Sequence, residues 1–135
     1  MLKVTHVLFP VALASFLSRE ASYLLAAGFF GILSDFDLLL KIRHRGFTHS
    51  LIFLFLISIL IYYLDKSLVI FALIGVGSHI LLDSMTKSGV QLFYPKKKKY
   101  RILSFRYDSF VLNGLIILFS LYILEKNGVV GWKFL

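Results

Sequence analysis

The chain has 135 residues, enough for one domain, of which 59% are hydrophobic and 16% charged, against about 25% charged in ordinary soluble domains. This composition excludes an ordinary soluble fold and predicts an integral membrane protein, and the absence of cysteine excludes disulfides and thiolate metal sites. The net charge is +8, and the basic residues lie between apolar segments, which favours anionic lipid headgroups over nucleic acid as partner.

Five apolar segments follow in chain order, and each predicts a helix. They are Val7–Leu17, Ala21–Leu33, Leu51–Leu64, Leu68–Leu82 and Phe110–Leu124. Each is shorter than the ~20 residues that span a bilayer, so each taken alone also fits a buried core helix. Together they predict an all-α fold, a single domain over residues 1–135 that forms a small membrane bundle of four to five apolar helices. The segment Val7–Leu17 fits a spanning, a re-entrant or an interfacial helix.

Charge predicts how this bundle is oriented. If all five segments cross the membrane, the N-terminus and the links after the second and fourth segments share one side. That side carries eleven basic residues and the other side four. The eleven are Lys3, Lys41, Arg43, Arg45, Lys87, Lys96–Lys99, Arg101 and Arg106. Because cytoplasmic loops are enriched in Lys and Arg, we expect a multi-pass protein of the cell (inner) membrane with this side in the cytoplasm.

The ionisable side chains gather at the same predicted membrane face. All four histidines and four of the seven acidic residues fall there: His6, Asp35, Asp37, His44, His49, His79, Asp83 and Asp108. The segments are defined by hydropathy alone, so hydropathy does not account for this convergence. Ionisable residues in membrane segments are rare and commonly functional. We therefore expect a polar site at this face.

Two pairs in this set have more than one interpretation. His79 and Asp83 are four residues apart and would share one helix face, where they could reach one metal ion or form a hydrogen-bonded polar pair. Asp35 and Asp37 follow an apolar helix, whose C-terminal carbonyls disfavour carboxylates unless a cation compensates. Alternatively, Ser34 or Asp35 caps a new short helix. Capping and metal ligation are compatible in such a stretch.

The break HRGFTHS, which begins at His44, separates two apolar segments. Gly46 predicts a turn, and Thr48 or Ser50 is a candidate N-cap for the following helix. His49 would then lie near the start of that helix, at the same face as the other ionisable residues. His44 fits either a metal ligand or a histidine at headgroup level.

Neutral imidazole nitrogens and carboxylate oxygens together suit a borderline divalent ion. Zinc is the first candidate, manganese and iron are others, and the number of donors allows one or two ions. Such an ion activates water for hydrolysis near neutral pH. Arg43 and Arg45 lie beside these donors, where they could hold an anionic group such as a phosphate or serve topology alone.

Four stretches resemble one known family. THVLFP, LSDFD, HRGFTHS and GVGSHILLDSMTKSGVQLFYP are similar to motifs of the YdjM-type family of inner-membrane proteins, described as predicted metal-dependent hydrolases. The resemblance covers roughly residues 5–95. That family is in turn distantly similar to the zinc-dependent phospholipase C and single-strand nuclease superfamily, whose helical bundles hold clustered zinc ions.

The superfamily resemblance implies a role for individual residues. The implied metal ligands are His6, Asp35, His49, His79 and Asp83. Four of them would hold one ion, while His6 would bind a second ion with Asp83 as the bridge. Asp37 and His44 are the implied catalytic residues, either behind the ligands or facing the substrate.

The sequence therefore predicts a membrane-bound metal-dependent hydrolase that cleaves a phosphoester, with a phospholipid among the candidates. Arg43 and Arg45 are the predicted substrate-binding residues, and the Lys96–Lys99 run is better explained as an anchor to anionic lipid. No nucleic-acid partner is expected, because topology already accounts for the basic segment. The alternative is a non-catalytic metal-binding membrane protein with a structural or partner-recruiting role. A closed set of protein ligands would indicate it, whereas a hydrolase keeps one position open.

Overall fold

The structure, a computed structural model, describes residues 1–39 and 45–131. In these two ranges the chain forms α-helices and short 3-10 helices, with two isolated β-bridges and no sheet. The elements are α1 (Lys3–Ala14), α2 (Ala21–Leu33), α3 (Phe36–Leu39), η1 (Phe47–His49), α4 (Leu51–Leu64), η2 (Lys66–Leu68), α5 (Val69–Ser84) and α6 (Phe110–Lys126). The predicted all-α class is confirmed.

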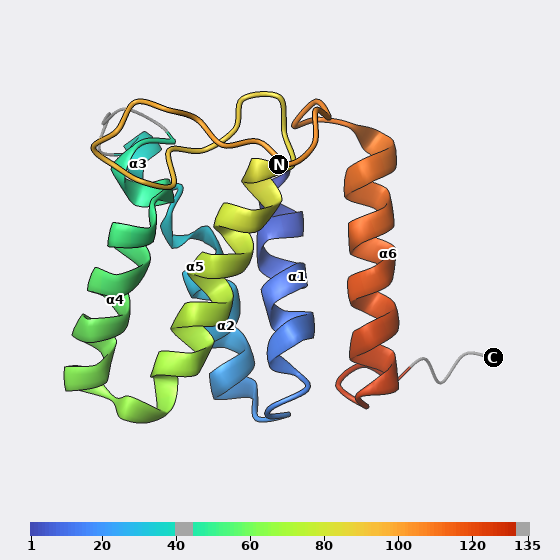
Figure 1. Ribbon diagram of the computed structural model, residues 1–135. Coiled ribbons are helices and arrows are strands. Elements are labelled where there is room, and N and C mark those ends of the chain that lie inside the picture. The colour runs from blue at the N-terminus through green and yellow to red at the C-terminus, as the bar shows by residue number, and fades with distance from the viewer. Residues whose placement is uncertain (40–44, 132–135) are drawn as a thin grey trace.

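The five longer helices stand side by side and alternate in direction (Figure 1). Helix α5 packs against α1, α2 and α4, while α6 packs against α1. Because the directions alternate, the starts of α1, α4 and α6 and the ends of α2 and α5 meet at one end of the bundle, which we call the polar end. This is the end at which the sequence places most of the ionisable residues.

The central helices approach one another closely at two glycines. A Cβ atom on Gly31 would collide with the carbonyl oxygen of His6 in α1. One on Gly75 would collide with Phe30 and lie 2.7 Å from the carbonyl oxygen of Ala27, both in α2. Small residues of this kind let helix backbones pack tightly in membrane proteins. Helices α1, α2 and α5 thus form the compact centre from which the site residues project.

The outer helices present apolar side chains to their surroundings. Helix α4, LIFLFLISILIYYL, has no buried residue, and α6 exposes Phe110, Val111, Leu115 and Leu118 by 60% or more of their surface. Exposed apolar area of this extent marks an interaction surface. Contact with lipid is the interaction that this composition predicts.

One helical stretch in the described ranges is long and apolar enough to cross a bilayer, Lys66–Ser84 with 19 residues. Helices α1, α2 and α4 have 12, 13 and 14 residues. A helix of fourteen residues is about 21 Å long, less than the ~30 Å of a bilayer's hydrocarbon core. The crossing of a membrane by four or five helices therefore stays a prediction.

The predicted segments match the helices best where polar breaks bound them. Helices α2 and α4 have the predicted bounds, but the first helix runs over Lys3–Ala14 rather than Val7–Leu17. It begins earlier because its first turn includes Thr5 and His6, two polar residues that are fully buried at the polar end. A hydropathy pattern marks such residues as polar and therefore does not assign them to an apolar helix. Ser50 caps α4, accepting a hydrogen bond from the amide of Phe53 at 3.3 Å, as one of the two predicted caps.

Residues 85–109 form a roof over the polar end (Figure 1). Backbone hydrogen bonds join its two limbs, with Val90 and Tyr100 exchanging both N–H···O bonds at 3.0 and 2.8 Å. The amide of Ile102 also donates to the carbonyl of Ser84 in α5 at 2.8 Å. The roof therefore has a defined backbone arrangement and is tied to the helix that carries part of the site.

Candidate metal centre

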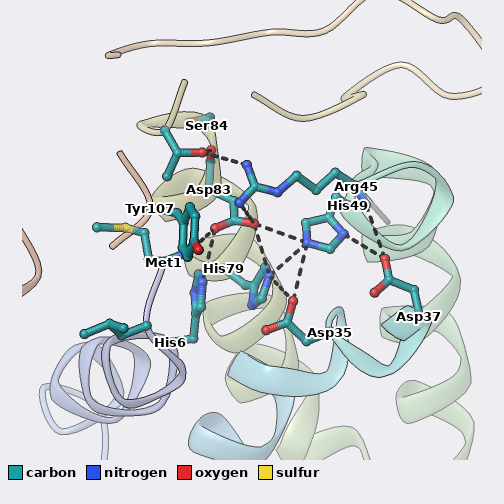
Figure 2. Close-up of polar contacts among 12 residues, drawn as sticks. Met1, His6, Asp35, Asp37, Arg45, His49, His79, Asp83, Ser84 and Tyr107 are labelled. Carbon is teal, nitrogen blue, oxygen red and sulfur yellow. Dashed lines mark hydrogen bonds and ion pairs between the residues drawn. The ribbon is translucent and has the colours of Figure 1, made fainter. Parts of the chain in front are cut away.

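Five ionisable side chains from four parts of the chain meet at the polar end (Figure 2). They are His6 of α1, Asp35 of the turn after α2, His49 of η1, and His79 and Asp83 of α5. The three histidines and Asp83 are at most 1% exposed. All five are residues that the sequence predicted as metal ligands, and the structure brings them together.

Four of these residues place one donor atom each around a common point. Nε2 of His49 lies 3.4 Å from Oδ2 of Asp83 and 3.9 Å from Oδ1 of Asp35. Nε2 of His79 lies 3.6 Å from the same Asp35 oxygen and 3.9 Å from the same Asp83 oxygen. The two Nε2 atoms are 3.0 Å apart. Ligand atoms of a tetrahedral zinc ion with bonds of ~2.0–2.1 Å are about 3.3 Å apart, which this spacing brackets.

The hydrogen bonds behind the two imidazoles fix which nitrogen faces this point. Nδ1 of His79 donates to the carbonyl oxygen of Gly31 at 2.6 Å, so neutral His79 presents a lone pair at Nε2. The hydroxyl of Thr48 donates to Asp37 at 2.8 Å and therefore accepts from Nδ1 of His49 at 3.0 Å. Neutral His49 would then also present its Nε2 lone pair, and the two Nε2 atoms face each other.

Two nitrogen lone pairs at this distance repel unless a cation lies between them. A proton would join only two atoms, whereas two nitrogens and two carboxylate oxygens converge here. The simple polar pair of His79 and Asp83 is not formed, because 3.9 Å is too long for a hydrogen bond. The buried cluster could therefore hold a metal ion. Its nitrogen and oxygen donors suit zinc, manganese or iron.

His6 adds a fifth donor beside these four. Its ring stacks on His79 with centroids 3.8 Å apart, and its Nε2 lies 3.2 Å from Oδ1 of Asp83. Its Nδ1 is buried and has no hydrogen-bond partner within the described ranges. The amino group of Met1 also donates to Oδ1 of Asp83, at 2.8 Å. The two oxygens of Asp83 thus face different histidines, which is the arrangement a bridging carboxylate requires.

Asp37 lies behind His49, on the side away from the convergent Nε2 atoms (Figure 2). It is fully buried, accepts hydrogen bonds from the Thr48 hydroxyl and the Arg45 amide at 2.8 and 3.3 Å, and lies 3.6 Å from Nδ1 of His49. Carboxylates in this position orient metal-binding histidines and raise their basicity. Asp37 therefore lies behind His49, one of its two predicted positions, and its role stays a prediction.

Arg45 brings a permanent positive charge to Oδ2 of Asp83, the same oxygen that lies near His49 and His79. Its Nη2 lies 3.4 Å from Oδ2 of Asp83, and its Nη1 donates to the hydroxyl of Thr86 at 2.7 Å. Its backbone has a φ of +63°, a left-handed conformation that is uncommon for a residue other than glycine. The side chain is buried beneath the roof, so its orientation is fixed by these contacts.

Asp108, the remaining predicted residue that the structure describes, does not join this cluster. Arg43 and His44 lie outside the described residues. Asp108 is exposed and accepts two hydrogen bonds from the Arg106 guanidinium, at 3.0 and 2.9 Å. These hydrogen bonds hold the pKa of the Asp108 carboxyl below its usual range. Ser109 rather than Asp108 caps α6, accepting from the amide three residues further on.

Three supporting residues were missed from the sequence. Thr48 is predicted only as a cap. Thr86, which accepts a hydrogen bond from the Arg45 guanidinium, is assigned no role by the sequence. Asn113 of α6 is buried and accepts hydrogen bonds from the Thr5 hydroxyl at 2.8 Å and the Leu2 amide at 3.1 Å. A lone asparagine in an apolar helix is a visible signal for such a role, and both threonines lie within stretches that resemble the family's motifs.

These features define an apolar, all-helical protein with a buried histidine and aspartate cluster at one end that could hold a metal ion. The whole chain, residues 1–135, matches the YdjM inner membrane protein family. The chain therefore belongs to this family, which confirms the resemblance noted at HRGFTHS and supports the predicted inner-membrane location.

A curated relative is the uncharacterized protein YvsG of Bacillus subtilis (strain 168), 36% identical over 61 residues. The aligned part covers 44% of this chain and 38% of YvsG, so the match spans well under half of either protein. No solved structure matches the chain.

Proposed function

We propose that the protein is a membrane-bound metal-dependent hydrolase that cleaves a phosphoester, with a phospholipid as one candidate substrate. One observation carries the proposal: of the five candidate ligands, Asp35 has the most exposed side chain. Its side chain is 16% exposed, whereas those of the other four are 2% exposed or less. A structural metal site is closed by protein ligands, whereas a catalytic one keeps a position open.

Asp35 lies in a cleft of about 230 Å³ that it lines together with Lys3, Ile32, Phe36 and Leu38. Most of this lining is apolar, and Lys3 adds one positive charge. A substrate with an apolar body and an anionic group suits such a cleft. This chemistry favours a lipid phosphoester over a soluble sugar phosphate.

Each part of the cluster has a role in this proposal. One or two ions would be held by His6, Asp35, His49, His79 and Asp83. When bound, a divalent cation supplies Lewis-acid activation of water and of the phosphoester. Asp37 would keep His49 in the tautomer whose Nε2 faces the ion. Arg45 would offset negative charge on the phosphoryl group. Arg43 and His44 stay candidates from sequence for substrate binding and catalysis.

The polar end would face the cytoplasm at the level of the lipid headgroups. The support is the distribution of charge, since the roof carries Lys87, Lys96–Lys99 and Arg101. Basic residues of this kind are retained on the cytoplasmic side and attract anionic lipid. A phosphoester brought there by the bilayer would lie next to the cleft at Asp35.

The alternative, a non-catalytic metal-binding protein, has one observation in its favour. Asp35, His49, His79 and Asp83 supply four donor atoms, as many as a tetrahedral ion takes. An ion held by all four would have no position for water unless its coordination expanded or Asp35 moved away. The accessibility of Asp35 favours the hydrolase.

Measuring bound metal and turnover on the same samples tests the proposal. The detergent-purified chain is loaded with zinc or manganese, analysed for metal, and assayed on a phosphomonoester, a phosphodiester and a short-chain phospholipid. We expect hydrolysis of at least one substrate and joint loss of metal and turnover in His79→Ala. Asp108→Asn is the matched control, because it removes a carboxylate at the same end but outside the cluster.

The results separate the two functions. Wild type that binds metal at full occupancy and hydrolyses none of the three substrates supports the non-catalytic alternative. Protein that stays metal-free after loading, with both variants folded, contradicts both functions. Turnover in metal-free His79→Ala equal to that of wild type contradicts a metal-dependent reaction.

A further inference from the structure

The outward face of α2 leads from the middle of that helix toward the cleft at Asp35. Leu25, Phe29 and Ile32 follow one another at helical spacing on this face. Leu25 and Phe29 are 73% and 51% exposed, whereas the opposite face of α2 is buried against α1 and α5. Ile32, in the last turn of the helix, lines the cleft. We call these three residues, together with Phe36 of α3, the α2 stripe.

The α2 stripe is continuous with the cleft. The rings of Phe29 and Phe36 make an edge-to-face contact with their centroids 6.5 Å apart, although they belong to different helices. Phe36 is exposed and lines the cleft together with Ile32. An apolar surface therefore runs from Leu25 to the candidate ligand Asp35.

The cleft opens beside α2 rather than beneath the roof. The described residues that line it belong to α1, to α2, to α3 and to the turn between the last two. Within the described part of the chain, the roof supplies none of them. A ligand that reaches Asp35 through this cleft therefore approaches from the side of the bundle, where it meets the α2 stripe.

Lys3 adds a cation to this cleft. It is exposed in the first turn of α1 and forms no ion pair with another described residue. The carboxylate of Asp35 is the negative group here, and the divalent ion of the proposed function would take up its charge. An anionic group in the cleft would then meet an ammonium group that has no other partner. Lysines at headgroup level attract anionic lipid in this way.

We propose that a lipid phosphoester enters the cleft from within the bilayer, with its phosphate beside Lys3 and an acyl chain along the α2 stripe. The inference rests on the proposed function, because it names the substrate as a membrane lipid and gives its path to the ion. A free phosphate would satisfy Lys3 but leave the α2 stripe uncovered, so the occupant is a lipid. Helices α4 and α6 also expose apolar faces, but neither contributes a described residue to this cleft.

Tryptophan fluorescence of the zinc-loaded, full-length chain in proteoliposomes tests this path. Trp132→Phe removes the native tryptophan, so that Phe29→Trp reports from the stripe alone. The probe is a phosphonate analogue of phosphatidic acid with brominated acyl chains, which quench tryptophan on contact. Its carbon–phosphorus bond resists hydrolysis, so the probe stays intact. Brominated phosphatidylcholine at the same mole fraction measures contact with bulk lipid.

Phe55→Trp, in the same Trp132→Phe background, is the matched control for depth. Phe55 lies four residues from the polar end of α4, as Phe29 does from the polar end of α2. We expect the phosphonate to quench Phe29→Trp about fivefold more than phosphatidylcholine does, and both lipids to quench Phe55→Trp about equally. Lys3→Gln should lower the excess at position 29 to below about twofold, because the ammonium group is lost. Lys97→Gln removes the same charge from the roof and should leave the excess unchanged.

An equal preference for the phosphonate at positions 29 and 55 would overturn the proposal, because it would show attraction to the protein as a whole. Equal losses in Lys3→Gln and Lys97→Gln would overturn it for the same reason. Selective quenching in a protein that hydrolyses none of the three test substrates would leave the lipid site in place and remove the hydrolase. Turnover of a soluble phosphoester without selective quenching would do the reverse.

Discussion

Nε2 of His49 and Nε2 of His79 lie 3.0 Å apart, and a hydrogen bond at Nδ1 orients each imidazole. Nδ1 of His79 is held by the carbonyl of Gly31, and Nδ1 of His49 by the hydroxyl of Thr48. Both rings are fully buried, and nitrogens 3.0 Å apart leave no space for a water between them. The fold thus places two electron-rich nitrogens beside carboxylates at a cost that a cation would offset.

Zinc should therefore stabilise the folded protein. A ligand that binds only the native state at a concentration of 100 Kd adds about 2.7 kcal/mol, so we expect the thermal midpoint in detergent to rise with zinc and fall with chelator. His49→Ala should lose this response, because it removes one of the four convergent donors. Circular dichroism melts with and without zinc provide the measurement. An equal zinc response in His49→Ala would show that the ion binds elsewhere.

Asp37→Asn should weaken metal binding without changing the number of ions bound. Asn keeps the shape but has no negative charge to hold the hydrogen-bonded pair of Thr48 and His49. Loss of such an orienting partner typically costs 10–100-fold in metal affinity or activity. Competition with a chromophoric chelator measures the affinity, and Asp108→Asn is the exposed control. Unchanged affinity with lost turnover would instead make Asp37 a catalytic residue, as the sequence analysis predicted.

Much of the fold could be predicted because its helices are apolar and the breaks between them are polar. Ala21–Leu33 and Leu51–Leu64 match the structure because Glu20 precedes the first, Ser50 the second, and polar residues follow both. The start of α1 could not be predicted this way, because its first turn buries polar side chains. The five longer helices alternate in direction, which brings the predicted ligands together at one end (Figure 1). The number of apolar segments in the sequence predicts this alternation.

The arrangement behind the ligands could not be predicted from sequence. The roles of Thr48 and Thr86 depend on contacts across 11 and 41 residues, to Asp37 and from Arg45. The left-handed backbone of Arg45 also has no sequence signal, since glycine or asparagine is usual in that conformation.

Gly75→Ala should destabilise the bundle, whereas Gly77→Ala in the same helix should not. The new Cβ at position 75 collides with Phe30, and relieving such overpacking costs about 1–3 kcal/mol. At Gly77 nothing lies within 4 Å of the added atom, and alanine is the better helix former by roughly 0.5–1 kcal/mol. Chemical unfolding in detergent compares the two. The packing argument fails if both variants change stability by the same amount.

Arg45→Gly should strengthen the response to zinc. Glycine adopts the φ of +63° without strain, so the variant removes the guanidinium and keeps the backbone. Asp83 then loses a positive neighbour at 3.4 Å, which destabilises the metal-free state and removes a charge that repels the ion.

The measurement for Arg45→Gly is the zinc-dependent rise in thermal midpoint, which should exceed that of wild type. Arg101→Gln is the matched control, because it removes one positive charge from the roof, where the Arg101 guanidinium donates to the carbonyl of Lys87. It should leave the zinc response unchanged. A smaller zinc response in Arg45→Gly than in wild type would mean that the guanidinium holds Asp83 in place for the metal. Arg45 would then be a positioning residue, and its charge would not oppose the ion.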